Sequence, residues 1–362
     1  MSIPDNAIIN DIRASSVFKG TTFSHYKLSE VKKQLIDNMN KGKIEPSCHW
    51  SIELICSGHY AELWECILLF VGKYIHIGNP KIIMYLEKRY EIFKNIVNQR
   101  HYNLEIDLRN NSTIRNIFAE IITILCQSNK KPSFETIKIN RVEEFDMTII
   151  KDRFKAKDTS YAMTVFEKDD PKELFISINE FAYHIGGPKP NMQEACYWIE
   201  WIIEFDIICR KRKQKCLCKR RSSDVENKFQ CDSIWIIWEV LLYYCEKKNN
   251  KSFLMPILTS LKTMFSAKYS LGTSKKRKYL LYFAIELLTE FVPTNIELIG
   301  NKDIVKNVIE KINEIYKQIK KNEVSPKTEY LFNNLSKENN LENSIKKLNM
   351  IENMDFVPRT GD

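Results

Sequence analysis

The sequence predicts an all-α protein built from antiparallel helical hairpins, arranged as an irregular HEAT-like α-solenoid or as a multi-helix bundle. The chain holds only 10 Gly and 11 Pro in 362 residues, whereas the many turns of an all-β protein would consume both residue types. Its apolar fraction of 44% is sufficient for a buried core. Apolar residues also recur at helical spacing along most of the chain.

The first third of the chain divides into an arm and a helical domain. Residues 1–28 have no sustained hydrophobic period, which predicts an extended or partly mobile N-terminal arm. Residues 29–127 are expected to form an N-terminal helical domain, and Gly58 separates two of its helical segments. Asn79 and Pro80 are expected to start a third long helix. Ser112 or Thr113 is expected to cap the next one.

The rest of the chain is predicted as a linker, a second domain and a tail. Residues 128–170 form an irregular linker in which Thr136–Asn140 alternates like a short strand. Residues 171–325, opened by Asp170 and Pro171, form a C-terminal helical domain, and residues 326–362 form a tail helix and a mobile end. The helical stretches expected after residue 190 are 195–209, 234–245, 253–265, 278–291, 304–319 and 341–351.

The charge balance favours an anionic partner. The formal net charge is +9 and the pI is near 8.9. However, Lys- and Asn-rich runs such as 247–251 and 337–343 indicate a compositional bias that raises the Lys count without a functional reason. The position of the charges is therefore more informative than their total.

The cysteines and apolar stretches predict a reducing compartment and no membrane span. Met1–Asn10 has neither the basic nor the apolar region of a secretory signal, so the 10 cysteines are expected to be reduced thiols rather than a disulfide framework. The two most apolar stretches, 195–209 and 234–245, are shorter than the roughly 20 residues that cross a bilayer. Both are predicted to be buried core helices, and the paired tryptophans in each are expected to pack in the core.

Two basic clusters are the candidate nucleic-acid-binding residues. Such clusters could neutralise phosphates of RNA or DNA, or serve as a nuclear import signal, while the alternative is a solvated loop without a role. The first cluster lacks the interleaved aromatic residues that would stack on bases. The residues concerned are Arg210, Lys211, Arg212, Lys213, Lys215, Lys219, Arg220, Arg221, Lys275, Lys276, Arg277 and Lys278.

Four cysteines near the first basic cluster are candidate metal ligands. Cys209, Cys216, Cys218 and Cys231 could supply four thiolates to a zinc ion, but their spacing does not fit the familiar zinc patterns, so buried or reduced thiols are expected and no cofactor is predicted.

Farther towards the N-terminus, Cys48, His49, Cys56 and His59 could form a nucleophile and base, with Glu53 nearby. No third orienting group is identifiable there, and the familiar enzyme motifs are absent from the sequence. No catalytic residue is therefore predicted.

Two segments resemble uncharacterised helical proteins of nucleocytoplasmic large DNA viruses. They are Trp50–Trp64, WSIELICSGHYAELW, and Lys275–Glu290, KKRKYLLYFAIELLTE. The resemblance carries no catalytic residue across. It implies a viral origin, a host cytoplasm (with the nucleus or the virion as alternatives) and a role in genome expression, replication or virion assembly.

The favoured hypothesis is a non-enzymatic helical scaffold or adaptor. It would bind protein partners through its grooves and contact nucleic acid, RNA in particular, through its basic loop in RNA processing or translation. The alternative is a structural virion component, a minor capsid or core protein, whose positive charge faces the packaged genome or an acidic neighbour. No small-molecule substrate is evident in the sequence.

Overall fold

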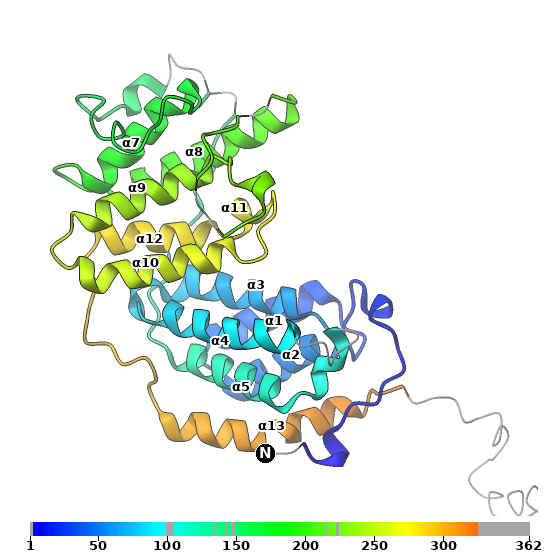
Figure 1. Cartoon of the computed structure of the whole chain (residues 1–362). Coiled ribbons are helices and arrows are strands. Elements are labelled where there is room, and N and C mark those ends of the chain that lie inside the picture. The colour runs from blue at the N-terminus through cyan, green and yellow to red at the C-terminus, as the bar shows by residue number, and fades with distance from the viewer. Residues whose placement is uncertain are drawn as a thin grey trace, which may run out of the picture.

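The computed structural model describes residues 3–98, 105–133, 135–141, 143–145, 150–214, 216–221 and 224–324. Within these ranges the chain is all-α, which confirms the predicted fold class, and the β-structure is limited to one isolated bridge between Thr21 and Lys27. The helices form two lobes that stack on one another (Figure 1). None of the helices in the described part is long and apolar enough to cross a membrane.

The N-terminal lobe is the lower one in Figure 1. The break between helical segments that the sequence predicts at Gly58 is confirmed. Gly58 lies between α2 and α3 with a φ of 76°, a conformation that residues with a Cβ disfavour. The predicted cap of the last helix is wrong by one residue, since the side chain of Asn111 accepts a hydrogen bond from Ile114 N. The helices are α1 (Leu28–Asn40), α2 (Ile44–Cys56), α3 (Tyr60–Phe70), α4 (Ile82–Asn98) and α5 (Ser112–Gln127).

The C-terminal lobe carries the most apolar helices of the chain. Its core contains the four predicted tryptophans, all of them buried: Trp198 and Trp201 on one helix and Trp235 and Trp238 on the next. The lobe consists of α7 (Phe175–Gly186), α8 (Met192–Lys211), α9 (Ile234–Glu246), α10 (Lys251–Ser266), α11 (Thr273–Lys276) and α12 (Lys278–Thr289).

The last described helix, α13 (Lys302–Lys320), leaves the lobe that precedes it in sequence. The connection over residues 290–301 runs down one side of the molecule (Figure 1), and α13 packs against α5 and α2. Its position therefore differs from the prediction, which grouped it with the helices of 171–325. Such a return is typical of a bundle, because in a solenoid each unit contacts only its neighbours. The predicted tail helix and mobile end, residues 326–362, lie outside the described residues.

The N-terminal arm, predicted as extended or partly mobile, contains two 3-10 turns, Asp5–Ala7 and Ser15–Phe18, and packs on the lobe. Phe18 and Phe23 are buried in the core. The buried guanidinium of Arg115 donates to Ala7 O at 3.0 Å and lies 3.7 Å from the ring centroid of Tyr316 on α13. One cation on α5 thus holds both the arm and α13 on the N-terminal lobe.

The segment between the lobes lies along the body and is partly buried. In its described parts, Ile137 and Ile139 pack against the core, and Thr136 and the Tyr279 hydroxyl are 2.7 Å apart. No strand forms at Thr136–Asn140, all of which is described. This segment lacks a neighbouring strand, so its alternation reflects an extended chain with one buried side.

The two lobes meet where η3, the π-helical turn Val71–Ile75, packs against α12. Gly72 makes this contact feasible, because a Cβ built on it would lie 2.9 Å from the backbone carbon of Tyr279. His76, the residue that follows η3, has a φ of 46° although it is not glycine. Strained backbone of this kind persists only where the surrounding contacts hold it in place.

His76 and Glu286 form a buried pair that joins the lobes, and the exposed Lys131 reaches this pair from the surface. His76 Nδ1 contacts Glu286 of α12, and Lys131 Nζ lies 2.8 Å from the other carboxylate oxygen of Glu286. His76 is 0% exposed and the Glu286 side chain 4% exposed. Burial disfavours the charged carboxylate, but the hydrogen bond from His76 and the charge of Lys131 outweigh it, so the pKa of Glu286 lies below its ordinary 4.5.

Replacing this carboxylate tests the contact. We expect Glu286→Gln to lower the free energy of unfolding at pH 7 by about 3 kcal/mol, as is usual when one partner of a buried ion pair is removed. The lowered pKa means that this stabilisation is complete above pH 4.5 and is lost as the pH falls through the folded-state value. Urea unfolding of the two proteins should therefore converge in acid. Glu290→Gln, at an exposed position at the end of the same helix, should have little effect.

Candidate binding groove at the lobe junction

The first basic cluster contains cations that hold the loop together. Arg221 is 5% exposed, and its guanidinium lies 2.6 Å from Asp170 and 2.5 Å from Glu239. Burial raises the pKa of Asp170, but the hydrogen bonds from Arg221 outweigh it and leave the pKa lowered. Asp170 was expected to open a helix and instead binds this arginine. α7 begins five residues later, after a 3-10 turn.

Other cations of the first cluster are also paired. Arg210 lies 2.7 Å from Asp206 and 3.0 Å from Asp232, and Lys219 lies 2.7 Å from Glu167. The exposed cations for which the described residues supply no ion pair are Lys211, Arg212, Lys213 and Arg220. Lys215 lies outside the described residues.

The second basic cluster likewise contains cations that are held in ion pairs and a cation that is exposed. Arg277 is buried, pairs with Glu65 of α3 at 2.5 Å and donates to the carbonyl oxygens at the end of α10. Lys278 pairs with Glu200 at 2.8 Å, and Lys275 with Glu204 at 3.3 Å. Lys276 is exposed, and no ion pair to it is found within the described part of the chain.

The fold brings the two basic clusters to adjacent positions on the C-terminal lobe. A small depression is lined by Asp206 and Asp232, which hold Arg210, and by Ser274 and Lys275 of α11. The salt bridge from Lys275 to Glu204 also ties α11 to α8, the helix on which the first cluster begins. The clusters are therefore close in space although more than fifty residues separate them in sequence.

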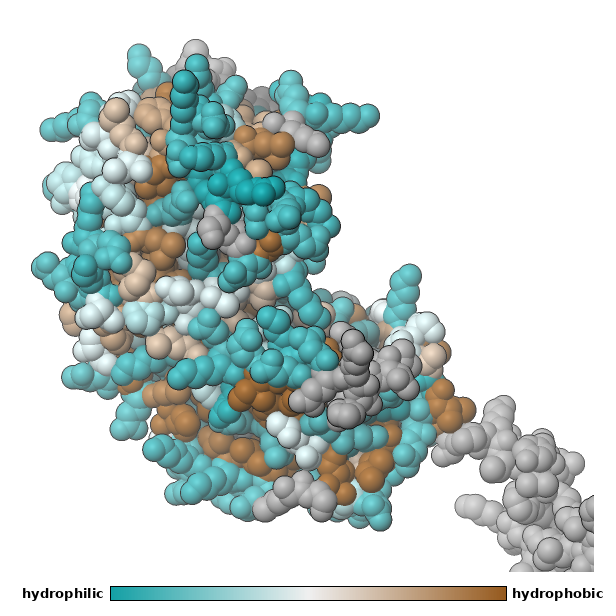
Figure 2. Space-filling view, in the orientation of Figure 1, coloured by the Kyte–Doolittle hydropathy of each residue, from teal (hydrophilic) through white to brown (hydrophobic). Residues whose placement is uncertain are grey.

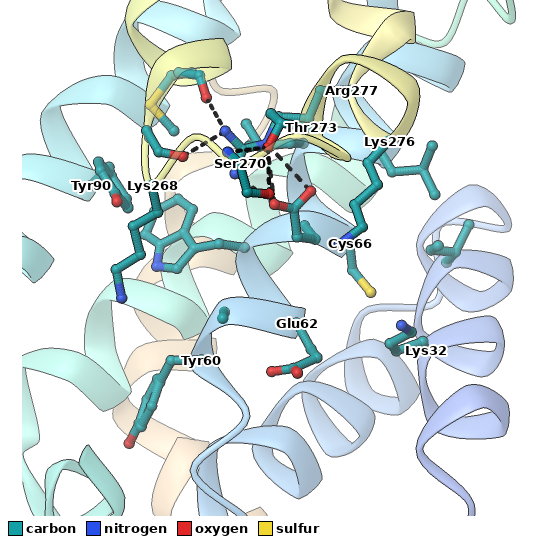
Figure 3. A pocket seen from close by; sticks show the side chains of 18 of the residues that line it. Lys32, Tyr60, Glu62, Cys66, Tyr90, Lys268, Ser270, Thr273, Lys276 and Arg277 are labelled. Carbon is teal, nitrogen blue, oxygen red and sulfur yellow. Dashed lines mark hydrogen bonds and ion pairs between the residues drawn. The ribbon is translucent and has the colours of Figure 1, made fainter. Parts of the chain in front are cut away.

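Beyond α11 the surface opens into a groove of about 520 Å³ between the lobes. α1 and α3 of the N-terminal lobe form one side, and the turn from α10 to α12 forms the other. Figure 3 shows Lys268 and Lys276 extending from the C-terminal lobe towards α3, with Lys32 and Glu62 on the opposite side. We call this the junction groove.

The floor of the junction groove is apolar and rigid. Trp64 packs edge-on against Tyr90 with ring centroids 5.0 Å apart, and it also contacts Phe93 at 5.8 Å. Trp64 and Phe93 are 5% exposed. Because the aromatic rings pack against one another, the floor offers apolar area rather than open ring faces on which bases could stack.

The rim of the junction groove is positive. Four lysines line it: Lys32, Lys33, Lys268 and Lys276. Of the two glutamates in the lining, Glu65 is neutralised by Arg277, which leaves Glu62 as the carboxylate nearest the floor. A groove with low-dielectric walls and one sign of charge concentrates ligands of the opposite sign.

The cysteines near the first basic cluster do not converge on a metal site. Among the described residues, no group of three or more His, Cys, Asp or Glu is placed to hold a metal ion. Cys218 N instead donates a hydrogen bond to Cys231 O at 2.9 Å, which joins the two sides of the loop. Burial is the largest cause that raises the pKa of the Cys216 thiol, to about 12.

The residues weighed as a nucleophile and base secure the arm instead. His59 Nε2 lies 3.0 Å from Phe18 O and 2.9 Å from Thr21 O. Glu53 accepts hydrogen bonds from the backbone and side chain of Ser24, and Cys56 is buried. These groups are occupied by the protein's own chain.

The sequence predicts Lys276 and Arg277 as nucleic-acid-binding residues, and it singles out none of the other residues that line the junction groove. Lys32 and Lys33 read as the polar face of a short helix, and Lys268 as a loop residue. Their joint role depends on how the lobes stack. One local signal exists, because Lys268 has a φ of 46° in the turn that forms the upper rim, but that value is visible only in the structure.

Arg220 and Arg221 are neighbours in sequence, but Arg221 is buried and paired with Asp170 whereas Arg220 is exposed. We expect Arg221→Gln to lower the midpoint of thermal unfolding by several degrees, because it leaves the buried Asp170 without its cation. Arg220→Gln removes an equal charge from an exposed neighbour and should leave the midpoint unchanged. Equal shifts in the two variants would show that Arg221 is not a structural residue.

Comparison with known proteins adds no relative. No family model matches the chain, and no curated protein or solved structure matches it.

Proposed function

We propose that this protein is a non-enzymatic scaffold that binds an acidic segment of a partner protein in the junction groove. The observation that carries the proposal is the combination of an apolar floor at Trp64 and Tyr90 with a rim of four lysines. An acidic segment with one apolar residue would match both features. The apolar residue would cover the floor while its flanking carboxylates meet the lysines.

The composition of the junction groove supports a binding role over a catalytic one. Its two glutamates flank no nucleophile with an adjacent base, and its cysteine, Cys66, is buried with a pKa raised to about 12, mainly by burial. Its histidine neighbour, His59, contacts Phe18 O of the arm through Nε2, and its Nδ1 lies 3.8 Å from the Glu62 carboxylate, with no nucleophile beside the pair among the groove-lining residues. The viral setting implied by the resemblance remains a prediction that belongs with this proposal.

Nucleic acid is the less favoured partner. Several cations of the two predicted clusters are held in ion pairs, so they are less available to phosphates than their number indicates. Lys211, Arg212 and Lys213 remain exposed at the end of α8 and could extend a binding surface beyond the junction groove. Their contribution would be electrostatic and would fall steeply with salt.

Binding of a synthetic peptide tests the proposal. The probe is a fluorescent peptide in which glutamates flank a central phenylalanine, titrated with the full chain at low and physiological salt. We expect Lys33→Glu combined with Lys276→Glu, two exposed lysines of the rim, to raise Kd at least about tenfold, because two attractive contacts become repulsive. Replacing the peptide's phenylalanine by alanine should weaken binding further.

The matched control is Lys302→Glu combined with Lys306→Glu, which reverses two exposed charges on α13 away from the groove. An equal rise in Kd in this control would show that the peptide responds only to the net charge of the protein, and it would contradict the proposal. Single-stranded RNA is titrated in parallel. Tighter binding of RNA, lost on replacing Lys211, Arg212 and Lys213 by serine, would favour the nucleic-acid role instead.

A further inference from the structure

A second groove lies on the N-terminal lobe, between α2 and α13. Its volume is about 380 Å³. Ile44 and Cys48 of α2 line one side, and Ile304, Val308 and Ile315 of α13 line the other. Figure 2 shows apolar residues gathered among polar ones on the visible face of the lower lobe. We call this the α2–α13 groove.

α13 has more apolar surface than its contacts with the lobe require. Its core-facing row is buried and consists of Val305, Ile312, Tyr316 and Ile319. A second row, Ile304, Val308 and Ile315, lies about 70° around the helix from the first and lines the groove. Ile304 is 37% exposed, and Val308 and Ile315 are only half-buried. The contacts of α13 with α5 and α2 therefore leave part of this second row uncovered.

The chain itself continues from the end of this groove. Gln318 lines the groove, and α13 ends two residues later, at Lys320. The end of the described chain is fixed in place, because Val324 N donates to Asp11 Oδ2 at 2.9 Å. Residues 325–362 follow and lie outside the described residues. The described chain thus ends at Val324, six residues after Gln318 of the groove lining.

The sequence of residues 341–351 has the pattern that this groove would accept. Leu341, Ile345 and Leu348 are spaced as one face of a helix. The same stretch carries Lys346 and Lys347 and one acidic residue, Glu342, while the groove lining has Glu45 and Glu314 and one basic residue, Lys311. Apolar and charged residues are thus complementary between the segment and the groove.

The connection is long enough for docking within one molecule. Residues 325–340 can span up to about 50 Å when extended, whereas α13 is about 28 Å long. The segment can therefore reach any part of the groove in either direction. A tether of this length holds it at an effective concentration in the millimolar range, which favours the chain's own segment over a second molecule.

We propose that residues 341–351 dock as an amphipathic helix in the α2–α13 groove of the same chain. The docked segment covers the second apolar row of α13 and completes the helical packing of the N-terminal lobe. This inference is independent of the junction groove, because the two surfaces share no residue.

Photo-crosslinking of the full chain provides the first test. p-Benzoyl-phenylalanine replaces Lys311, an exposed residue in the groove lining, or Lys306, an exposed residue of α13 outside it. Equal amounts of ¹⁵N-labelled and unlabelled chain are mixed and irradiated. We expect the probe at Lys311 to join residues 341–351 in products of a single isotope label at monomer mass, and the probe at Lys306 to give none. Products of mixed label would identify a second copy as the occupant and overturn the proposal.

Hydrogen exchange of the full chain provides the second test. Docking should slow exchange of the amides of residues 341–351 by about 10-fold or more relative to the same sequence as a free peptide. Val308→Asp or Ile345→Asp should abolish this protection, and Lys306→Asp should not. Ile345→Asp lies outside the described body, so it tests docking even if Val308→Asp impairs folding. Exchange at the free-peptide rate in the unmodified chain would overturn the proposal.

Discussion

The contact that His76, Lys131 and Glu286 make between the lobes is the polar constraint on which the arrangement of the two lobes depends. It joins the end of α3, the segment between the lobes and α12, three parts of the chain that are far apart in sequence. His76 and Glu286 are buried and Lys131 reaches them from the surface, so polar groups with fixed partners hold the lobes in one orientation rather than letting them slide along an apolar surface. The positive φ of His76 and the close approach at Gly72 belong to the same contact.

That orientation creates the junction groove. Its floor comes from α3 and α4 and its upper rim from the α10–α12 turn, so neither lobe contains it alone. Arg277 is central to this rim, because it closes the carbonyl end of α10 and pairs with Glu65 across the junction. A basic residue that the sequence suggested for nucleic acid therefore supports the groove from inside, while Lys268 and Lys276 remain at its surface.

The return of α13 has a comparable effect on the N-terminal lobe. Arg115 holds the arm and α13 together through one buried guanidinium, and this leaves α13 with a second apolar row along the α2–α13 groove. The two termini of the described chain meet in the same region, since Asp11 accepts from Val324 N. An arm, a returning helix and a groove thus form one continuous surface of the lower lobe.

The sequence by itself determined the helices. Periodic apolar residues and Gly58 place α1 to α3 within a few residues, because these signals act between neighbours in the chain. It also located Lys276 and Arg277, but it could not distinguish exposed from paired cations. Whether Arg221 meets Asp170, or Lys32 faces Lys268 across a groove, depends on contacts between distant segments. Only the tertiary structure decided those, because burial and charge pairing are properties of the packed chain and not of local spacing.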